Sequence, residues 1–297
     1  MAILWIISIL SIAVFSATQF LFIELESGAN SRSLFRAEQL ADRGVAIGSH
    51  PEVQRGDPLL IGEINEVESF SARISSEGDR LNLNSLLEQP ENDRMVLEEL
   101  FMRWGLRRDQ AEDVLDNLID WVDNNEESTR LGAERSFYFE RGRINHPFNR
   151  KFGSLEEVEL VNQFGLVIAA NPLWRDSFTL LSAGPLDLNE APAELIAAAC
   201  ECGTVSAEQF VKLRDGFDGQ PGTTDDLQFE ALEQVTAELN IPEPFKDRVA
   251  ARISIEDPSR RIIARGRLGR IAVERHVTVQ YTGDLTKIMR WTTRRIE

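Results

Sequence analysis

Cysteine and histidine are scarce in this chain of 297 residues, which contains two cysteines and three histidines. The cysteines, Cys200 and Cys202, are too few for a disulfide-stapled miniature scaffold or a cysteine-rich zinc module. A bond between them would be strained, so we expect free thiols or alternative partners. The histidines form no multi-histidine metal cluster in the sequence, and we expect His146 and His276 to be ordinary surface or packing residues.

The chain also lacks the sequence signatures of common enzymes. It has no Gly-x-Ser-x-Gly elbow, no phosphate-binding loop and no His-Glu-x-x-His motif. We therefore predict that the protein is not an enzyme, with no catalytic residues, no bound organic cofactor and no small-molecule substrate.

Basic residues are too few for a nucleic-acid-binding protein. Asp and Glu outnumber Lys and Arg by 49 to 32, which gives a formal charge of −17 and a pI near 4.7. Phosphate backbones attract clustered basic residues, so we expect no nucleic-acid partner. Residues 246–297 nevertheless carry a net charge of +7, against −24 for the rest. This division fits electrostatic matching between domains or subunits, or simply a solvated mixed surface.

The first 23 residues contain no charged side chain. A helix of this length rises about 35 Å, enough to cross a hydrocarbon core of about 30 Å. A cleaved secretory signal would begin with basic residues, and no Lys or Arg precedes this apolar run. We favour a retained transmembrane helix at 1–23 over a cleaved signal or a buried soluble helix. Apolar residues then recur at helical spacing, which predicts an amphipathic stem at 24–48 whose C-terminal part packs on its own globular domain.

The remaining residues indicate a mainly helical region followed by strands. The alternation of Phe70, Ala72 and Ile74 predicts a strand within 64–74. Helices are predicted at 94–104, 108–122, 155–164, 192–200 and 206–214. From about residue 260 we expect β-rich segments split by Gly266, Gly269 and Gly283, with a closing strand at 288–293.

Three local patterns predict helix starts. Leu81-Asn-Leu-Asn84 and Leu186-Asp-Leu-Asn189 nearly repeat one another just ahead of predicted helices. Asn84 and Asn189 are therefore candidate N-caps. Ser154, with Glu157 three residues later, predicts a capping box.

An acidic loop offers oxygen ligands for a metal ion. The candidate ligands are Asp120, Asp123, Asn125 and Glu134, around a loop that contains Gly132. Hard cations such as calcium take six to eight oxygens, which such a loop can help to supply. The spacing is not that of an EF-hand, and a solvated acidic loop without a metal is the alternative.

Taken together, these features resemble the minor pseudopilin K of type II secretion systems, the general secretion pathway protein K family. The uncharged N-terminal helix is the first of them. The others, in chain order, are Ala37-Glu38 through Gly44, Glu77–Asn84, Ile119–Asp123, Gly132–Glu134, Phe152–Val158 and Leu186–Leu195. The resemblance runs over nearly the whole chain.

The resemblance implies an α+β fold with a long N-terminal helix. A pilin-like α/β domain would begin at 49–80 and be interrupted by a helical SAM-like insertion at 81–185. A second helical region, SAM-like or helix-hairpin-helix-like, would follow at 186–255. Strands of 256–297 would complete the pilin-like domain.

The same resemblance implies a function in protein secretion. Such a protein crosses the inner membrane once and keeps its C-terminal domain in the periplasm. It lies at the tip of a short pseudopilus and primes its assembly with minor pseudopilins I and J for secretion across the outer membrane. Family members bind calcium, which we would expect at Asp120, Asp123, Asn125 and Glu134.

Two features of the N-terminus bear on this interpretation. Other pseudopilins carry a glutamate at mature position five, which the K subunit characteristically lacks, and this chain has Trp5. A prepilin leader should be basic and end in Gly, and none precedes the apolar run that begins at Met1. We therefore expect either a start assigned downstream or the mature form.

Two other membrane-anchored classes remain as alternatives. One is a competence-type DNA receptor, because Leu186–Leu195 also resembles the opening of helix-hairpin-helix domains. The turn Cys200-Glu-Cys-Gly-Thr204 is acidic rather than glycine-rich, which argues against phosphate binding. The other is a minor pilin of a type IV pilus-like machine.

Overall fold

The structure is a computed structural model that describes residues 2–219, 221, 223, 225–283 and 285–296. Met1 and Glu297, the outer ends of the predicted terminal segments, lie outside these residues. The chain divides into two compact units. Unit 1 comprises residues 1–74, 262–277 and 290–297, and unit 2 comprises residues 75–261 and 278–289.

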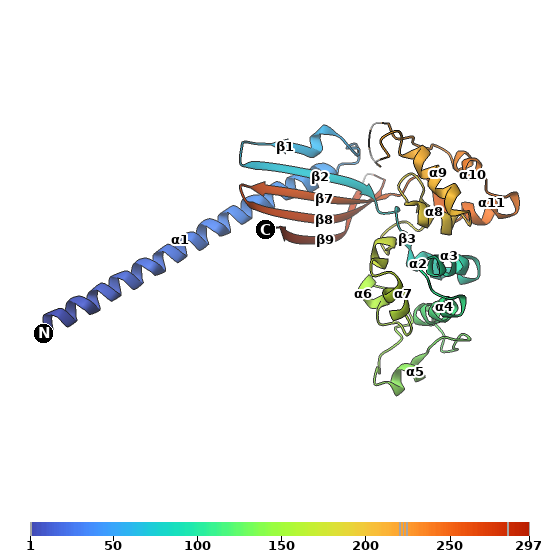
Figure 1. Cartoon of the computed structure of the whole chain (residues 1–297), viewed down its shortest axis with the longest axis horizontal. Coiled ribbons are helices and arrows are strands. Elements are labelled where there is room, and N and C mark those ends of the chain that lie inside the picture. Colours follow the sequence, from blue (N-terminus) through green and yellow to red (C-terminus); the bar gives the residue numbers. More distant parts are fainter. Residues whose placement is uncertain (1, 220, 222, 224, 284, 297) are drawn as a thin grey trace. The chain divides into compact units, whose positions relative to one another are not determined.

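Runs of helices and runs of strands follow one another along the chain (Figure 1). In order they are α1 (Ala2–Gly48), the 3-10 helix η1 (Pro58–Leu60), β1 (Ile61–Glu63), β2 (Glu68–Ser76), β3 (Leu81–Asn82), α2 (Leu83–Glu88), α3 (Pro90–Arg103), α4 (Arg108–Val122), α5 (Arg135–Glu140), α6 (Leu155–Val158), α7 (Gly165–Ala170), the 3-10 helix η2 (Trp174–Ser177), β4 (Phe178–Thr179), β5 (Leu186–Asp187), α8 (Ala193–Ala199), α9 (Thr204–Arg214), α10 (Leu232–Glu238), α11 (Glu243–Ala250), β6 (Ile253–Ser254), β7 (Ser259–Leu268), β8 (Ile271–Thr282) and β9 (Leu285–Ile296).

The N-terminal helix α1 is continuous from Ala2 to Gly48, which confirms that the helix runs on past Glu24. None of its most apolar window is buried against the described residues, and Trp5 is 68% exposed. The helix is long and apolar enough to cross a membrane, with a mean hydropathy of 2.2 in its most apolar window. Only its C-terminal part is buried, through Ala37, Leu40, Ala41 and Val45.

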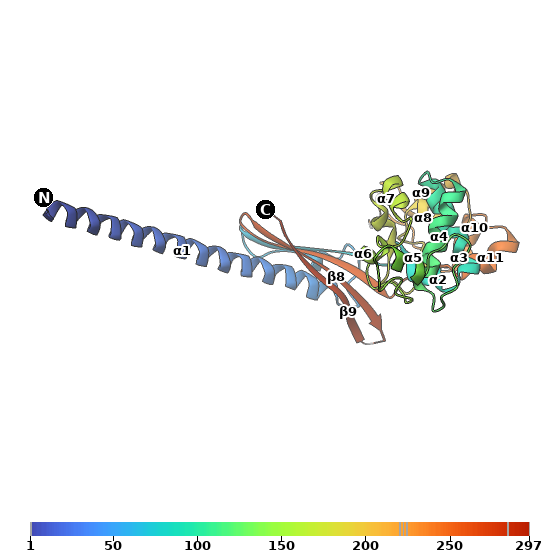
Figure 2. The ribbon, with the colours of Figure 1, turned by 90° about the horizontal axis from the view of Figure 1, so that it is seen from below.

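That buried part of α1 packs on a five-stranded sheet of order β1-β2-β7-β8-β9 (Figures 1 and 2). At Gly266 in β7 an added Cβ would lie 2.1 Å from the carbonyl oxygen of Ala37, so only glycine allows this approach. The prediction that Gly266 splits the β segment was therefore wrong, because Gly266 lies inside β7. Gly269 and Gly283 do lie in turns, at positive φ.

The strand predicted within 64–74 is β2, which begins later, at Glu68. The Asn65 side-chain oxygen accepts hydrogen bonds from the backbone N–H groups of Val67 and Glu68, at 3.0 and 2.9 Å. These bonds form a turn ahead of β2. β1 then pairs with β2 in antiparallel register, with Gly62 opposite Phe70.

Unit 2 contains a core of aromatic and aliphatic side chains, which includes the fully buried Trp121, Trp174 and Tyr138. The predicted helix 108–122 is confirmed as α4, and α3, α8 and α9 cover the helices predicted near 94, 192 and 206. The helix predicted at 155–164 was wrong, because α6 ends at Val158 and Gln163 has a φ of 65°.

Asn162 explains that break. Its backbone N–H donates to the Tyr138 hydroxyl at 3.0 Å, and its side-chain amide donates to Asn117 at 3.0 Å. These tertiary bonds replace continued helical bonding.

Each of the two Leu-x-Leu-Asn stretches precedes a helical segment. The strand that ends each segment pairs with the strand that begins it. β3 pairs in parallel with β4, and β5 pairs in parallel with β6. The prediction that Asn84 and Asn189 cap helices was wrong: Asn82 caps α2 and Pro192 is the N-cap residue of α8. Asn84 instead bonds both the N–H and the C=O of Phe152, and Asn189 bonds those of Phe229.

The elements together form an α+β fold with a long N-terminal helix, as predicted. The finer division into pilin-like and SAM-like regions stays a prediction.

Candidate cation site

The end of α4 and the start of α5 bring three carboxylates together. Asp120 lies in the last turn of α4, and Asp123, three residues later, is the C-cap residue of the same helix. Glu134 is the N-cap residue of α5. One oxygen from each of the three lies within 4.8 Å of the others.

Asp120 is fully buried and organises the loop that follows α4. Both of its carboxylate oxygens accept the backbone N–H of Thr129 at 3.1 Å. Gly132 passes so close that an added Cβ would lie 2.0 Å from Asp120 Oδ2. Asp120 and Gly132 therefore fix the loop path that returns the chain to Glu134.

Glu134 is 3% exposed, and neither of its carboxylate oxygens has a hydrogen-bond partner among the described residues. Burial, followed by the charges of Asp120 and Asp123, raises the pKa of this carboxyl to about 7. Burial also raises the pKa of Asp120 and of Asp123 above the ordinary value. Each buried ionised carboxylate is costly unless a positive charge compensates it.

Asn125, the fourth predicted ligand, contacts the cluster through its amide nitrogen. Its Nδ2 donates to Asp123 Oδ2 at 2.9 Å, and its Oδ1 accepts the backbone N–H of Glu127 at 2.6 Å. In this arrangement Asn125 holds Asp123 in place and does not offer its side-chain oxygen to the cluster.

The set of donors suits a hard divalent cation. Three carboxylates supply oxygen and no sulfur or nitrogen, which is the chemistry that Ca²⁺ prefers, and carbonyl groups or water can complete six to eight ligands. A buried carboxylate without a partner is the observation that fits a bound cation best. Asp120, Asp123 and Glu134 would hold such an ion, which would cross-link α4 to α5.

Glu157 and Asn149, which the sequence did not single out for this role, form hydrogen bonds with Trp121 near the C-terminal end of α4. Trp121 donates its indole N–H to Glu157 at 3.1 Å, and Asn149 donates its backbone N–H to the Trp121 carbonyl at 3.1 Å. Ser154 caps α6 as predicted, but Glu157 accepts the N–H of Gly153 rather than completing the capping box. Sequence gave no signal for this use, because Trp121 lies 36 residues from Glu157.

The other singled-out residues are structural. His146 packs on Trp121 and Phe148, with ring centroids 5.3 and 4.9 Å apart. His276 lies 2.6 Å from Glu274. Cys200 and Cys202 are both free thiols, and burial raises the pKa of each.

The cation cluster lies inside the part of the chain that matches a known family. Residues 79–170 match the family model described as type II secretion system (T2SS), protein K. The resemblance to protein K is confirmed over these residues. The search of curated proteins found no match.

The fold is also similar to that of a solved structure. The structure is similar to GspK in the crystal structure of the GspK-GspI-GspJ complex from the enterotoxigenic Escherichia coli type 2 secretion system. The TM-score is 0.62 at 15% sequence identity, and the match covers 94% of this chain and 99% of that chain. The chain therefore has the fold of GspK over nearly its full length.

Proposed function

We propose that this protein is a GspK-type minor pseudopilin, a membrane-anchored structural subunit that assembles with minor pseudopilins I and J. The fold match over 94% of the chain, to a subunit of the GspK-GspI-GspJ complex, carries this proposal. The family match over residues 79–170 supports it independently. In this role the protein is not an enzyme.

The proposed location is the inner membrane, crossed once by α1, with the rest of the chain in the periplasm. The lack of charge in residues 2–23 and the exposure of residues 5–23 support a helix surrounded by lipid. Beyond Ile23 the helix becomes charged and then packs on the sheet, as expected for a stem outside the bilayer.

The proposed mechanism is priming from the tip of the pseudopilus. A subunit with another above it in lipid would need a buried acid to pair with the neighbour's N-terminal amine, and residues 2–23 contain no acidic side chain. Helical growth needs both faces of a subunit free, so the bulk of unit 2 would block addition above it. The complex would then start the pseudopilus that supports secretion across the outer membrane.

We further propose that Asp120, Asp123 and Glu134 bind calcium and thereby stabilise unit 2. The unpartnered Glu134 carboxylate beside two aspartates supports this proposal. Asn125 contributes by orienting Asp123.

Co-purification of the full-length chain tests the assembly. The tagged chain is expressed with the I and J candidates, extracted in detergent and purified, and we expect all three to elute together. Phe35, 63% exposed on α1, offers a contact for a neighbouring helix, so Phe35→Glu should reduce recovery of the partners. Val205, 66% exposed on α9, is the matched control, and Val205→Glu should not reduce it.

Two results would contradict the proposed function. One is that folded I and J fail to associate with the full-length chain at micromolar concentration. The other is that the chain binds duplex DNA at physiological salt, which would favour the competence-type alternative.

A further inference from the structure

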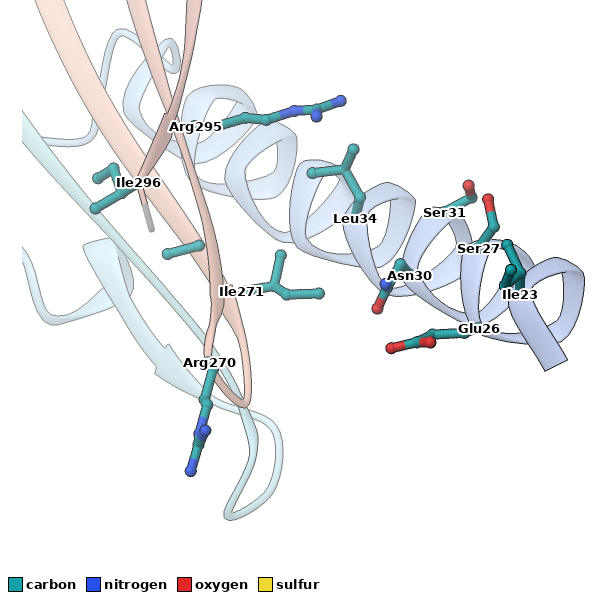
Figure 3. A pocket seen from close by; sticks show the side chains of 11 residues that line it. Ile23, Glu26, Ser27, Asn30, Ser31, Leu34, Arg270, Ile271, Arg295 and Ile296 are labelled. Carbon is teal, nitrogen blue, oxygen red and sulfur yellow. The ribbon is translucent and has the colours of Figure 1, made fainter. Parts of the chain in front are cut away.

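A groove lies between α1 and the neighbouring ends of β8 and β9, all within unit 1 (Figure 3). Its volume is about 720 Å³. Its α1 wall is a single helical face, formed by Ile23, Glu26, Ser27, Asn30, Ser31 and Leu34. One turn beyond Leu34, toward the C-terminal end of α1, the sheet covers the same helical face and buries Ala37. The groove therefore lies where this face of α1 is no longer covered by the sheet.

The lining combines apolar and polar side chains and carries more positive than negative charge. Arg270 and Arg295 lie on the strand side, and Glu26 is the single carboxylate opposite them (Figure 3). Both arginines are exposed. Within the described part of the chain, neither guanidinium has a hydrogen-bond or ion-pair partner. Arg295 extends toward α1, whereas Arg270 extends away from it at the other end of the strand side (Figure 3). The guanidinium groups, the serine hydroxyls and the Asn30 amide are donors of the kind that a phosphate group requires.

The groove lies at the level where α1 would leave the hydrocarbon. Ile23 ends the uncharged run, and a rise of about 1.5 Å per residue places Asn30 about 10 Å and Leu34 about 16 Å beyond it. The headgroup layer occupies roughly the first 5–8 Å, and at physiological salt charges act over about 8 Å more. Ile23 therefore lies next to acyl chains while the arginines remain within reach of lipid phosphates.

We infer that this groove binds the headgroup of an anionic phospholipid from the bilayer that α1 crosses. The inference rests on the membrane-spanning part of the proposed function. Arg295 and the polar side chains of α1 hold the phosphate, Arg270 adds positive potential at the other end of the groove, and Ile23 and Ile271 contact the apolar part of the same lipid. The lipid would orient the sheet against the membrane surface before assembly.

Native mass spectrometry of the full-length chain tests the lipid preference. The chain is released from micelles that contain equal amounts of phosphatidylglycerol and phosphatidylcholine. Each arginine near an anionic surface adds favourable binding free energy for an anionic lipid. For the two arginines together we expect at least a tenfold excess of phosphatidylglycerol adducts over phosphatidylcholine adducts. Arg270→Gln with Arg295→Gln should bring the ratio close to one, and raised salt should lower it for the unmodified chain.

Two further variants separate the groove from net charge and from misfolding. Arg107→Gln with Arg108→Gln changes the net charge equally in unit 2, at two exposed residues, and should leave the ratio unchanged. Glu26→Gln removes the opposing carboxylate and should raise the ratio. A ratio near one in the unmodified chain, or one that the groove variants do not change, would overturn the inference.

Photo-crosslinking distinguishes a lipid from a protein occupant. A photoreactive residue at Asn30 in the full-length chain, irradiated in phosphatidylglycerol vesicles with I and J present, should give an adduct with the mass of one phospholipid. Adducts with a polypeptide alone would overturn the inference in favour of a helix of a partner. Resistance of the chain to carbonate extraction is measured in parallel, because its loss would refute the membrane anchor itself and not only the lipid site.

Discussion

Replacing Glu134 by glutamine separates the cost of a buried charge from the gain of a bound cation. The pKa of this carboxyl rises from 4.5 to about 7 on folding, mainly through burial. Because a tenfold change in proton affinity corresponds to about 1.4 kcal/mol, the ionised group destabilises the cation-free fold by about 3 kcal/mol. The buried amide of glutamine keeps an unmet hydrogen-bond requirement of about 1–2 kcal/mol. Glu134→Gln should therefore stabilise the cation-free protein at pH 8 by about 1–2 kcal/mol.

The pH dependence follows from the same values. Below pH 4.5 the carboxyl is protonated in both the folded and the unfolded chain, and the group costs nothing. Between pH 4.5 and about 7 only the unfolded chain loses the proton, so the stability of the cation-free protein falls as pH rises. The advantage of Glu134→Gln should thus be present at pH 8 and absent at pH 4.

Calcium should reverse the order of stabilities. At a hundredfold excess over its dissociation constant, calcium stabilises the unmodified protein by about 2.7 kcal/mol, and the variant should gain little. Thermal unfolding of the full-length chain in detergent, with chelator or with calcium, measures both effects. For unit 2 we expect about 2–4 °C for each kcal/mol.

Glu127→Gln is the matched control, because Glu127 is exposed in the same loop and the charge change is identical. It should leave both melting temperatures unchanged. The reasoning would be refuted if Glu134→Gln lowered the melting temperature in chelator, or if calcium stabilised both proteins equally. A chelator that does not change the melting temperature of the unmodified chain would remove the calcium proposal.

Four other substitutions test how the fold is held together. Gly266→Ala should destabilise unit 1 by several kcal/mol, because its Cβ would lie 2.1 Å from the Ala37 carbonyl oxygen and push α1 away from β7; Gly165→Ala, with open space around it, should be neutral or stabilising by up to about 1 kcal/mol. Both are measured by urea unfolding. Asn189→Ala should cost about 2–4 kcal/mol, because three backbone groups lose a partner. Asn84→Ala removes two such bonds and should cost less, and equal midpoints for the two asparagine variants would contradict this ranking.

The spacing of apolar residues was sufficient to predict an element whose apolar residues recur with the period of a helix. α4 spans the predicted residues because its apolar positions all face one core. The pairing of Asp120 with Asp123 follows from the same helix geometry. The sequence also placed Glu134 near them, although its burial without a partner depends on the whole of unit 2.

Prediction failed where a side chain acts far along the chain. Asn84 and Asn189 have the composition of N-caps but bond to residues 68 and 40 positions away. Gly266 was interpreted as a break because glycine ends strands locally, whereas here it allows contact with α1. The helix predicted to reach residue 164 stops early because Asn162 bonds to Tyr138 and Asn117. Local propensity contains no information about such partners.

The parallel pairs β3–β4 and β5–β6 have a mechanical consequence. Each joins the two ends of a helical segment, so residues 81 and 178, and residues 186 and 253, lie next to one another despite the long chain between them. Tension along the backbone would pass across these short ladders before it reached the helices enclosed by them. Force is therefore carried by the two short strand pairs rather than by the helices between them. The length and internal packing of each helical segment can change while its first and last residues stay paired.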